Sequence, residues 1–228
     1  MTVSSTVGGL FVGKAKERWP GKPPSAIAKF PTAGPQHLIE TGFISDEQAD
    51  LRVHGGADKA VHHYPAEHYT FWQSKRFPSS FAFQPGGFGE NVSCAGLKEA
   101  DVCIGDIFEL GSAIVQISQG RQPCWKLNKH TRVDEMAMLM QQSGKTGWYY
   151  RVLQQGQVQT GDPIKLVERL HESWDMRRLI SARFDKNISR EEAKELSEIE
   201  ELASGWRQYF FKRANKVFVE DQTARLVG

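Results

Sequence analysis

A β-hairpin is predicted by the stretch Ile107-Phe108-Glu109-Leu110-Gly111-Ser112-Ala113-Ile114-Val115-Gln116-Ile117-Ser118. Two apolar, β-branched runs flank a Gly-Ser pair, and a two-residue turn of this kind between strand-like runs is typical of a hairpin. Shorter runs of the same character occur elsewhere in the chain, at 9–12, 26–30, 149–153, 157–160 and 164–167. Many short strands joined by turns predict a barrel or a sandwich.

Two helices are expected among these strands. Pro65 can occupy the first position of one, because its missing N–H is not needed there. Residues 134–143 carry methionine and leucine side chains at helical spacing, and Gly144 follows as a stop signal.

The pattern becomes helical from about residue 170. Candidate helix starts are Ser173, Ser189 and Ser204, and Glu192 completes a capping box with Ser189. We therefore expect a β-rich domain at 1–167 and a three-helix extension at 168–228, arranged as a small bundle or a helix-turn-helix. Residues 170–228 contain eleven Lys/Arg and eleven Asp/Glu. A DNA-reading bundle has a basic footprint, so docking or dimerisation is the favoured role.

Composition narrows the class of protein. The 228 residues are 39% apolar and 25% charged, which is ordinary for a soluble globular protein. The net charge of +2 gives no strong field for nucleic acid or an anionic membrane. We see no signal peptide and no membrane-spanning run. Three cysteines without an export signal indicate reduced thiols, so a cytoplasmic protein is expected, with neither nucleic acid nor membrane as a partner.

The predicted hairpin leads directly into a cysteine flanked by cations, in Gln119-Gly120-Arg121-Gln122-Pro123-Cys124-Trp125-Lys126-Leu127-Asn128. A thiol reacts or binds metal as the thiolate, and Arg121 and Lys126 lower the cost of that charge. Pro123 stiffens the local backbone. The alternative for Cys124 is a buried structural thiol. We interpret Cys103 in this way, because it lies in an apolar run.

A second candidate segment is Val53-His54-Gly55-Gly56-Ala57-Asp58-Lys59-Ala60-Val61-His62-His63-Tyr64-Pro65. Its glycines allow a ligand to approach the backbone closely. Its donors, His54, Lys59 and His62, suit a phosphate or another anion. The cluster of His54, His62, His63 and His68 also raises zinc, but the spacing fits no usual zinc pattern. The alternative is a polar turn leading into a helix.

A third segment is the glycine-rich loop Gln84-Pro85-Gly86-Gly87-Phe88-Gly89-Glu90-Asn91-Val92. It lacks the Lys-Ser/Thr of a phosphate-binding loop and the glycine spacing of a dinucleotide fingerprint. Taken alone it is a turn. Together with the other segments, its polar pair Glu90-Asn91 could fix the edge of a bound ring system.

In this order, the three segments resemble the MOSC family, named for the C-terminal domain of molybdenum cofactor sulfurases. The resemblance rests on His54-Gly55-Gly56 with Asp58-Lys59-Ala60-Val61, on Phe88-Gly89-Glu90-Asn91, and on Gln122-Pro123-Cys124 with Lys126-Leu127-Asn128. It covers most of the chain up to about residue 167, and the remainder resembles the three-helix extension of one bacterial branch. The implied fold is mainly β with helices: a MOSC-type β-barrel followed by a small three-helix C-terminal domain.

The resemblance also implies a cofactor, the molybdenum cofactor, in which a molybdopterin carries a dithiolene and a phosphate. A cysteine at the position of Cys124 is a metal ligand in reductases of the family, and molybdenum in this cofactor favours soft sulfur. The implied cofactor-binding residues are His54, Gly55, Gly56, Lys59, His62, Glu90, Asn91, Arg121, Lys126 and Asn128. Many members have Gln-Pro-Arg where this chain has Gln119-Gly120-Arg121, and the glycine adds backbone freedom. The family association also suggests pyridoxal phosphate as a ligand.

The implied activity is a molybdenum-dependent reduction of small N-hydroxylated compounds, such as hydroxylaminopurine-type bases, hydroxylamines or amidoximes, in detoxification. A separate electron-donor protein is expected, because three cysteines cannot supply the four thiolates of an ordinary iron–sulfur site and no nicotinamide fingerprint is present. The helical tail is a plausible docking surface for that donor. Two alternatives remain: a non-catalytic carrier of cofactor or sulfur with a persulfide at Cys124, and a cysteine hydrolase with a histidine base, for which no nucleophile signature is present. The oligomeric state is left open.

Overall fold

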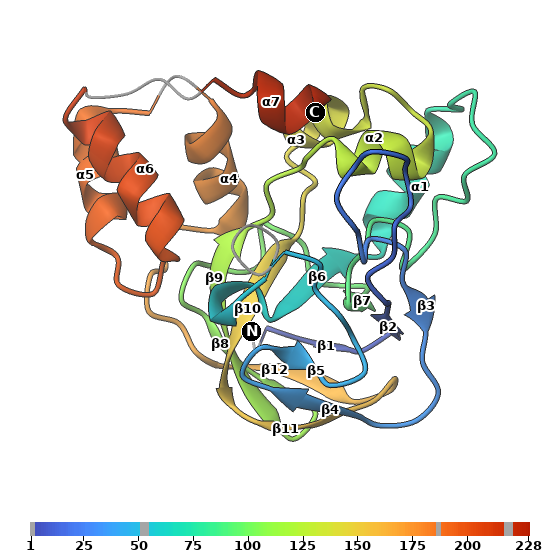
Figure 1. Ribbon diagram of the computed structural model, residues 1–228. Helices are drawn as coiled ribbons and strands as arrows, with labels where there is room; N and C mark the ends of the chain where they lie inside the picture. Colours follow the sequence, from blue (N-terminus) through green and yellow to red (C-terminus); the bar gives the residue numbers. More distant parts are fainter. Residues whose placement is uncertain (1–2, 51–54, 186–187, 217–220) are drawn as a thin grey trace.

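One large sheet forms the centre of the molecule. The computed structural model describes residues 3–50, 55–185, 188–216 and 221–228 (Figure 1). The nine strands of this sheet are β1 (Ser4–Thr6), β2 (Gly9–Val12), β3 (Phe30–Pro31), β6 (Val61–Pro65), β7 (Val92–Cys94), β8 (Ile107–Leu110), β9 (Ala113–Gly120), β10 (Trp148–Gln154) and β12 (Pro163–Glu168). Their spatial order is β1-β12-β8-β9-β10-β6-β7-β2-β3. The pair β6–β7 is parallel and the other neighbours are antiparallel.

This sheet closes on itself. β1 lies at one edge, and β2 lies seven positions along the strand order. In the chain, however, only Val7 and Gly8 separate them. Strands in a flat sheet are about 4.8 Å apart, so about 34 Å would separate β1 from β2, whereas a two-residue connection spans roughly 10 Å. The sheet must therefore curl into a barrel, as expected from the resemblance, and the Gly8 N–H donates to the carbonyl of Ser93 at 2.9 Å across the closure.

The predicted hairpin is confirmed as β8 and β9, with Leu110 opposite Ala113. Gly111 in its turn has a φ of +59°, a left-handed conformation that favours glycine. The turn packs against β11 (Gly156–Val158), which belongs to a small second sheet with β4 (Gln36–Ile39) and β5 (Gly42–Phe43). β11 thus pairs with β4 and not with β10, which precedes it in the chain. Of the strand expected at 26–30, only Phe30 lies in a strand.

Three helices lie at one end of the barrel: α1 (Glu67–Ser74), α2 (Lys126–Thr131) and α3 (Met136–Ser143). The expectation that Pro65 begins a helix is wrong, because Pro65 is the last residue of β6 and lies opposite Cys94 of β7. The Ala66 N–H continues this pairing by donating to the Cys94 carbonyl at 2.8 Å, so the helix starts only at Glu67. α3 ends as predicted at Gly144, which has a φ of +66°. The end helices share a second apolar cluster around Phe88, Tyr64 and Trp72.

The described part of the C-terminal region contains the three expected helices and one more. They are α4 (Met176–Phe184), α5 (Arg190–Glu198), α6 (Ser204–Ala214) and the additional α7 (Thr223–Val227). The Ser189–Glu192 capping box is present at α5. α4 begins after Asp175, whose side chain accepts from the Arg178 N–H at 2.9 Å, and not at Ser173. An N-cap side chain bonds to the N–H of the second or third residue that follows it, as Asp175 does here. Ser173 lies two residues too far upstream to make this bond.

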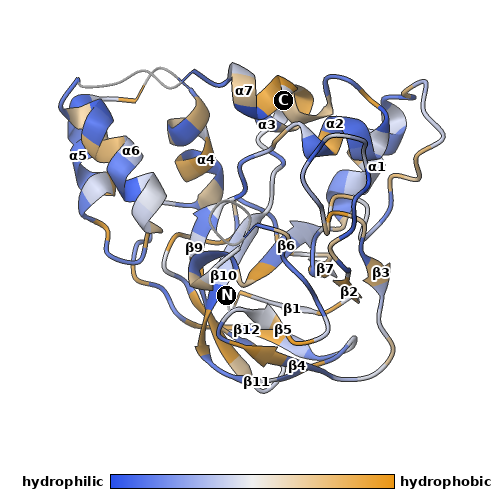
Figure 2. Ribbon diagram, viewed as in Figure 1, coloured by the Kyte–Doolittle hydropathy of each residue, from blue (hydrophilic) through white to orange (hydrophobic). Residues whose placement is uncertain are grey.

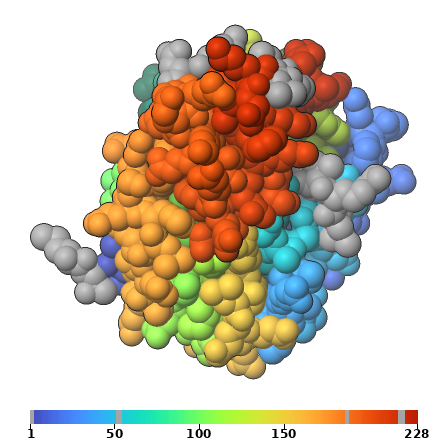
Figure 3. All heavy atoms as spheres, turned by 90° about the vertical axis from the view of Figure 1, so that its left-hand side faces the viewer, coloured from blue at the N-terminus to red at the C-terminus, as the bar shows by residue number. Residues whose placement is uncertain are grey.

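α4, α5 and α6 pack against one flank of the barrel (Figures 1 and 3). The main apolar cluster runs without a break from barrel residues such as Ile117 to Trp174, Ile180 and Trp206 of the helical region. The helices also bond to barrel backbone, since the Ala203 N–H donates to the carbonyl of Ser118 at 2.9 Å. The division at 167/168 expected from sequence texture therefore crosses a common core, and it stays a prediction as a domain boundary.

Gly120, at the end of β9, has a packing role rather than the conformational one expected. Its φ is not among the positive values of the structure. A Cβ atom built at Gly120 would lie 2.7 Å from Cγ1 of Ile180 and 3.0 Å from Cη2 of Trp206. The missing side chain allows α4 and α6 to approach the strand that leads into the cysteine segment.

Hydrophobic residues gather on the strands of the barrel, while hydrophilic residues predominate on the loops at its upper end and on α5 and α6 (Figure 2). Within the described ranges, no helix has the length and apolar character needed to span a bilayer.

Candidate functional site

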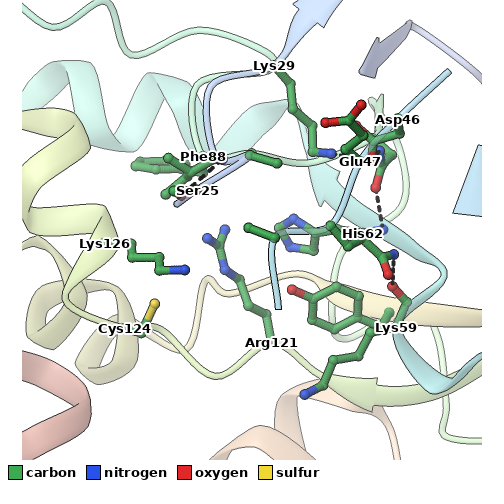
Figure 4. A pocket seen from close by; sticks show the side chains of 17 residues that line it. Ser25, Lys29, Asp46, Glu47, Lys59, His62, Phe88, Arg121, Cys124 and Lys126 are labelled. Atoms are coloured by element: carbon green, nitrogen blue, oxygen red, sulfur yellow. Dashed lines mark hydrogen bonds and ion pairs between the residues drawn. The ribbon is translucent and has the colours of Figure 1, made fainter. Parts of the chain in front are cut away.

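A pocket opens beside the cysteine segment at the helix-bearing end of the barrel (Figure 4). Its cavity volume is about 90 Å³, below the roughly 300–1,000 Å³ usual for a ligand pocket. The enclosed part therefore suits a small polar group, and a larger ligand would extend toward the open side. The lining comes from six chain segments and consists of Ser25, Ala26, Ile27, Lys29, Asp46, Glu47, Gln48, Ala49, Lys59, His62, Phe88, Gly89, Asn91, Arg121, Cys124, Lys126 and Tyr149.

The cysteine and its two cationic neighbours point into the same space. Figure 4 shows the Cys124 sulfur, the Lys126 ammonium and the Arg121 guanidinium converging on the pocket. The half-buried Cys124 lies just before α2, and its carbonyl accepts from the Leu127 N–H at 2.9 Å. In contrast, Cys94 and Cys103 are buried, and burial raises the pKa of each thiol to about 11. Cys124 is thus the cysteine placed to meet a ligand.

Arg121 is a buried cation with unused hydrogen-bonding capacity. Only 7% of the residue is exposed, and its Nη1 atom is buried without a hydrogen-bond partner in the described part of the chain. A buried donor that lacks a hydrogen-bond partner costs about 1–3 kcal/mol of stability, and more if the group is charged. A donor of this kind, directed into a pocket, is the arrangement expected for a side chain that binds an anionic ligand.

Lys59 approaches the pocket from a tight turn. It ends a short 3-10 helix (Ala57–Lys59) that follows Gly56, whose φ of 89° and ψ of 173° are accessible to glycine alone. The Gly56 N–H donates to the Gln48 side chain at 3.3 Å, which fixes the turn to the neighbouring loop. Gly55 and Gly56 do not line the pocket, and their role here is to position Lys59. His54 lies outside the described residues.

Lys59 and Cys124 are near enough to influence each other. Burial lowers the pKa of Lys59, while the negative charges of Asp58, Asp50 and a Cys124 thiolate oppose that shift. The same thiolate acts with burial to raise the pKa of Tyr149, which Arg121 opposes.

His62 lies in β6 against Tyr149, with their ring centroids 5.0 Å apart. Its Nε2 is 3.4 Å from the carbonyl oxygen of Thr146, and because a carbonyl only accepts, Nε2 carries the proton there. Burial, together with the Arg121 charge, holds the pKa of His62 well below its usual range. His62 is therefore a neutral donor and acceptor at physiological pH, and a poor general base for a cysteine hydrolase, which needs a base with a pKa near the working pH.

His63 and His68 do not line the pocket. His63 stacks on Trp148 and contacts the sulfur of Cys94, and burial lowers its pKa to about 3. His68 pairs with the buried Glu99 at 2.7 Å. Across residues 3–50, 55–185, 188–216 and 221–228, no group of three or more His, Cys, Asp and Glu side chains is placed to hold a metal ion. The histidine cluster seen in sequence is therefore dispersed, apart from His54, which lies outside those ranges.

Glu90 holds the glycine-rich loop in shape. Burial raises the pKa of its carboxyl, while hydrogen bonds from Tyr69 and the loop backbone oppose that shift. The carboxyl accepts from the Tyr69 hydroxyl and the Gly86 N–H, both at 2.6 Å, and from the Phe88 N–H at 3.0 Å. Glu90 does not line the pocket, and it shapes the pocket indirectly by holding the Phe88-Gly89 segment that does.

Of the two candidate asparagines, Asn91 lines the pocket and Asn128 does not. Asn91 lines the pocket, but its side chain is engaged with the His62 N–H, the Phe11 carbonyl and the Asp46 carboxylate. Asn128 lies away from the pocket: its amide donates to the Leu226 carbonyl at 2.8 Å and accepts from the Ala137 N–H at 2.7 Å. Asn128 therefore joins α2, α3 and α7.

Lys29 and Asp46 are pocket residues that sequence reasoning missed. Their side chains are 8% and 6% exposed and form an ion pair on the wall opposite Cys124 (Figure 4). Burial lowers the pKa of Lys29, and the Asp46 charge opposes this. A lysine inside the apolar run 26–30 is an available signal, because a cation seldom enters such a run without a partner. Nothing near Asp46 in the sequence indicates its role.

With this geometry in place, comparison with known proteins assigns the family. The MOSC domain model matches residues 50–165, more than half of the chain. This chain is a member of the MOSC family. Protein YiiM of Escherichia coli strain K12 is 39% identical over 220 residues, covering 96% of this MOSC protein and 97% of YiiM. The crystal structure of YiiM from Escherichia coli has a TM-score of 0.81 at 30% identity, covering 100% of this chain and 98% of that one.

The likeness to YiiM extends through the helical region, so the C-terminal helices belong to the architecture that the two MOSC proteins share. A Gibberella moniliformis protein named Reductase is 36% identical over 167 residues, covering 72% of this chain and 30% of that protein. Most of the present MOSC protein is thus similar to one part of a longer protein that is named Reductase.

Proposed function

We propose that this protein binds the molybdenum cofactor through Cys124 and reduces small N-hydroxylated compounds. The observation that carries the proposal is the convergence of one accessible thiol with an incompletely bonded buried guanidinium in a single pocket. Family membership and the fungal reductase support an oxidoreductase.

The donor set fits the cofactor's chemistry. The Cys124 thiolate is a soft ligand of the kind that molybdenum accepts. The unused Arg121 Nη1 and the ammonium groups of Lys126 and Lys59 suit the anionic dithiolene, oxo or phosphate groups. The enclosed volume takes one end of such a molecule, so the pterin would occupy the open side.

When bound, the molybdenum centre would supply two-electron removal of the N–OH oxygen, with the balance R–NH–OH + 2e⁻ + 2H⁺ → R–NH₂ + H₂O. The chain's own residues would prepare the site for this chemistry. Arg121 and Lys126 would hold negative charge beside Cys124 without needing to reorganise, and such preorganised electrostatics is usually the largest catalytic contribution. His62 would offer its Nδ1 as an acceptor, since its proton is on Nε2.

The decisive experiment measures molybdenum and released pterin in protein purified from cofactor-competent cells, for the wild type and Cys124→Ser. We expect close to one molybdenum per chain in the wild type and at least a tenfold loss in the variant. The matched control is Cys103→Ser, which alters a buried thiol away from the pocket and should retain the metal.

A second measurement uses reduced methyl viologen as electron donor and an N-hydroxylated purine as substrate, with the amine product quantified. Molybdenum without turnover would leave cofactor binding intact and contradict the reductase. Persulfide sulfur on Cys124 in metal-free wild-type protein would instead identify a sulfur carrier. Wild-type protein free of molybdenum would overturn the proposal.

A further inference from the structure

Positive charge is concentrated in two segments of an almost neutral chain. Residues 14–29 contain five Lys/Arg and one Glu, and residues 121–132 contain four Lys/Arg and no acidic residue. Each segment therefore has a net charge of +4. Because the whole chain has a net charge of +2, the other 200 residues have a net charge of −6.

The fold brings these two segments together at the pocket. The rings of Trp19 and Trp125 pack edge-on with centroids 5.6 Å apart. The Lys22 ammonium lies 5.2 Å from the Trp125 ring centroid, and the Lys126 ammonium donates to the Pro24 carbonyl at 3.4 Å. Both segments also supply pocket-lining residues, so their charge lies beside the site that holds Cys124.

Several of these cations face solvent. Lys16, Lys22, Lys129 and Arg132 are exposed and Arg18 is half-buried; we call these five residues the basic rim. Figure 2 shows the loop of residues 14–24 as a hydrophilic strip beside α2. Acidic side chains near the rim are few: Glu17 within the loop, Asp134 and Glu135 beyond α2, and Glu47, which pairs with Lys14 at 3.1 Å and accepts from the Ala15 N–H at 2.9 Å.

The reaction proposed above consumes two electrons per turnover, and three cysteines cannot form an ordinary iron–sulfur site to supply them. A redox partner must therefore reach the pocket, and its contact surface should carry charge opposite to the rim. The helical tail expected from sequence to dock the partner has a net charge of zero over residues 170–228 and packs on the flank of the barrel. It offers no comparable electrostatic attraction.

We propose that the basic rim docks an acidic electron-carrier protein over the mouth of the pocket. This inference rests on the proposed function for the identity of the partner, but the docking can be tested without it. Complementary charge raises association rates by 10- to 1,000-fold and makes them fall steeply with ionic strength. Four of the five rim cations are long, exposed side chains, so the contribution of the rim should be mainly to the association rate.

The binding experiment uses an acidic flavodoxin as probe and measures its association with the full-length protein by surface plasmon resonance at several salt concentrations. The test variant is Lys16→Glu/Lys129→Glu, which reverses two exposed rim charges outside the pocket lining. We expect affinity for flavodoxin to fall about tenfold or more, and its dependence on salt to weaken. The control is Lys98→Glu/Lys165→Glu, which makes the same change in net charge on exposed residues away from the rim and should bind like the wild type.

The kinetic experiment uses cofactor-loaded protein with two electron donors. With reduced flavodoxin, the rim variant should lose about tenfold in kcat/KM, measured against flavodoxin concentration. With reduced methyl viologen, a small cation that needs no acidic docking face, its rate should equal that of the wild type.

The outcomes separate the two proposals. Equal flavodoxin binding by wild-type, rim and control proteins overturns the docking surface, whatever the activity. Binding lost in both double variants also overturns it, because net charge alone would then be responsible. Tighter binding of the wild type to duplex DNA or to anionic lipid vesicles than to flavodoxin would assign the rim to a different partner and reject this one. Rim-dependent flavodoxin binding without viologen-driven turnover would keep the surface and reject the reductase.

Discussion

His130 lies in the last turn of α2, with its ring 5.1 Å from that of Phe81. Burial and the charges of Arg18 and Arg121 lower its pKa to about 4. The unfolded chain takes up this proton near pH 6.5, while the folded chain does so only near pH 4. Folded-state stability linked to His130 is therefore present above pH 6.5 and is lost as the pH falls toward 4.

We predict that His130→Gln flattens the pH dependence of the free energy of unfolding between pH 6.5 and 4, by at most about 1.4 kcal/mol per pH unit. Urea denaturation at intervals of half a pH unit measures this slope. His37→Gln is the control, because His37 is exposed on β4 and should leave the slope unchanged. Unaltered pH dependence in His130→Gln would show that His130 does not titrate as its surroundings indicate.

At this scale, the sequence identified residues whose partners are close in the chain. Cys124, Arg121 and Lys126 lie within six positions of one another, so their convergence followed from local geometry. The ion pair of Lys29 and Asp46 joins loops that approach only after the barrel closes. The role of Asn128 was missed for the same reason. Its amide bonds to the Leu226 carbonyl of α7, and nothing near Cys124 in the sequence indicates so distant a partner.

α7 is the element most directly connected to the cysteine segment. The Trp125 N–H donates to the Arg225 carbonyl at 2.8 Å, and the Arg225 guanidinium donates to the carbonyl of Pro123 and to Gln141 of α3. Both residues adjoining Cys124 are therefore bonded to one short helix. Because α7 has only five residues, its stability must come from these contacts.

We predict that Arg225→Gln loosens the Cys124 segment and increases alkylation of Cys124 by a neutral thiol reagent severalfold. Mass spectrometry of the modified peptide gives the rate at each site, and the buried Cys94 and Cys103 serve as internal references. Arg190→Gln, on the exposed start of α5, is the control. If alkylation of Cys124 proceeds at the wild-type rate in Arg225→Gln, α7 does not restrain the segment.

Elements were foreseeable where a local signal defined their ends. The Gly111-Ser112 turn, the Ser189 capping box and Gly144 each correspond to an observed boundary. α2 and α7 were missed because five or six residues show too little periodicity, and their burial depends on the tertiary contacts around them. Pro65 was misassigned because its compatibility with a helix start did not exclude the parallel pairing with β7.

At the scale of the whole molecule, the barrel and the C-terminal helices are coupled through Gly120. The Cβ of an alanine at this position would overlap Ile180 of α4 and press on Trp206 of α6. Separation of these helices from β9 would disturb the strand end that carries Arg121 and, three residues later, Cys124.

We predict that Gly120→Ala lowers the free energy of unfolding by about 1–3 kcal/mol, the usual cost of overpacking a core. In the double variant with Ile180→Ala, the loss should be smaller than the sum of the two single losses, because Ile180→Ala removes the atom closest to the new methyl group. Urea denaturation of the two single variants and the double variant gives the coupling energy. Strictly additive losses would show that the helices do not confine Gly120.

The architecture could be anticipated from family resemblance and strand content, but strand order could not. The pairing of β11 with β4, and of β1 with β12, joins segments whose apolar patterns are too short to specify a partner. Register and order are set by the closed barrel as a whole, where each strand must match neighbours on both sides.

The two-residue link between β1 and β2 has a consequence for synthesis of the protein. Ser4 of β1 lies opposite Lys165 of β12, so synthesis must pass Lys165 before these two strands can pair. The barrel therefore cannot close on a nascent chain until β12 has emerged, and folding dominated by such distant pairings is slow. β1 stays without its partner until β12 has been synthesised, so this protein should depend on chaperones at the ribosome more than a protein built from local helical contacts.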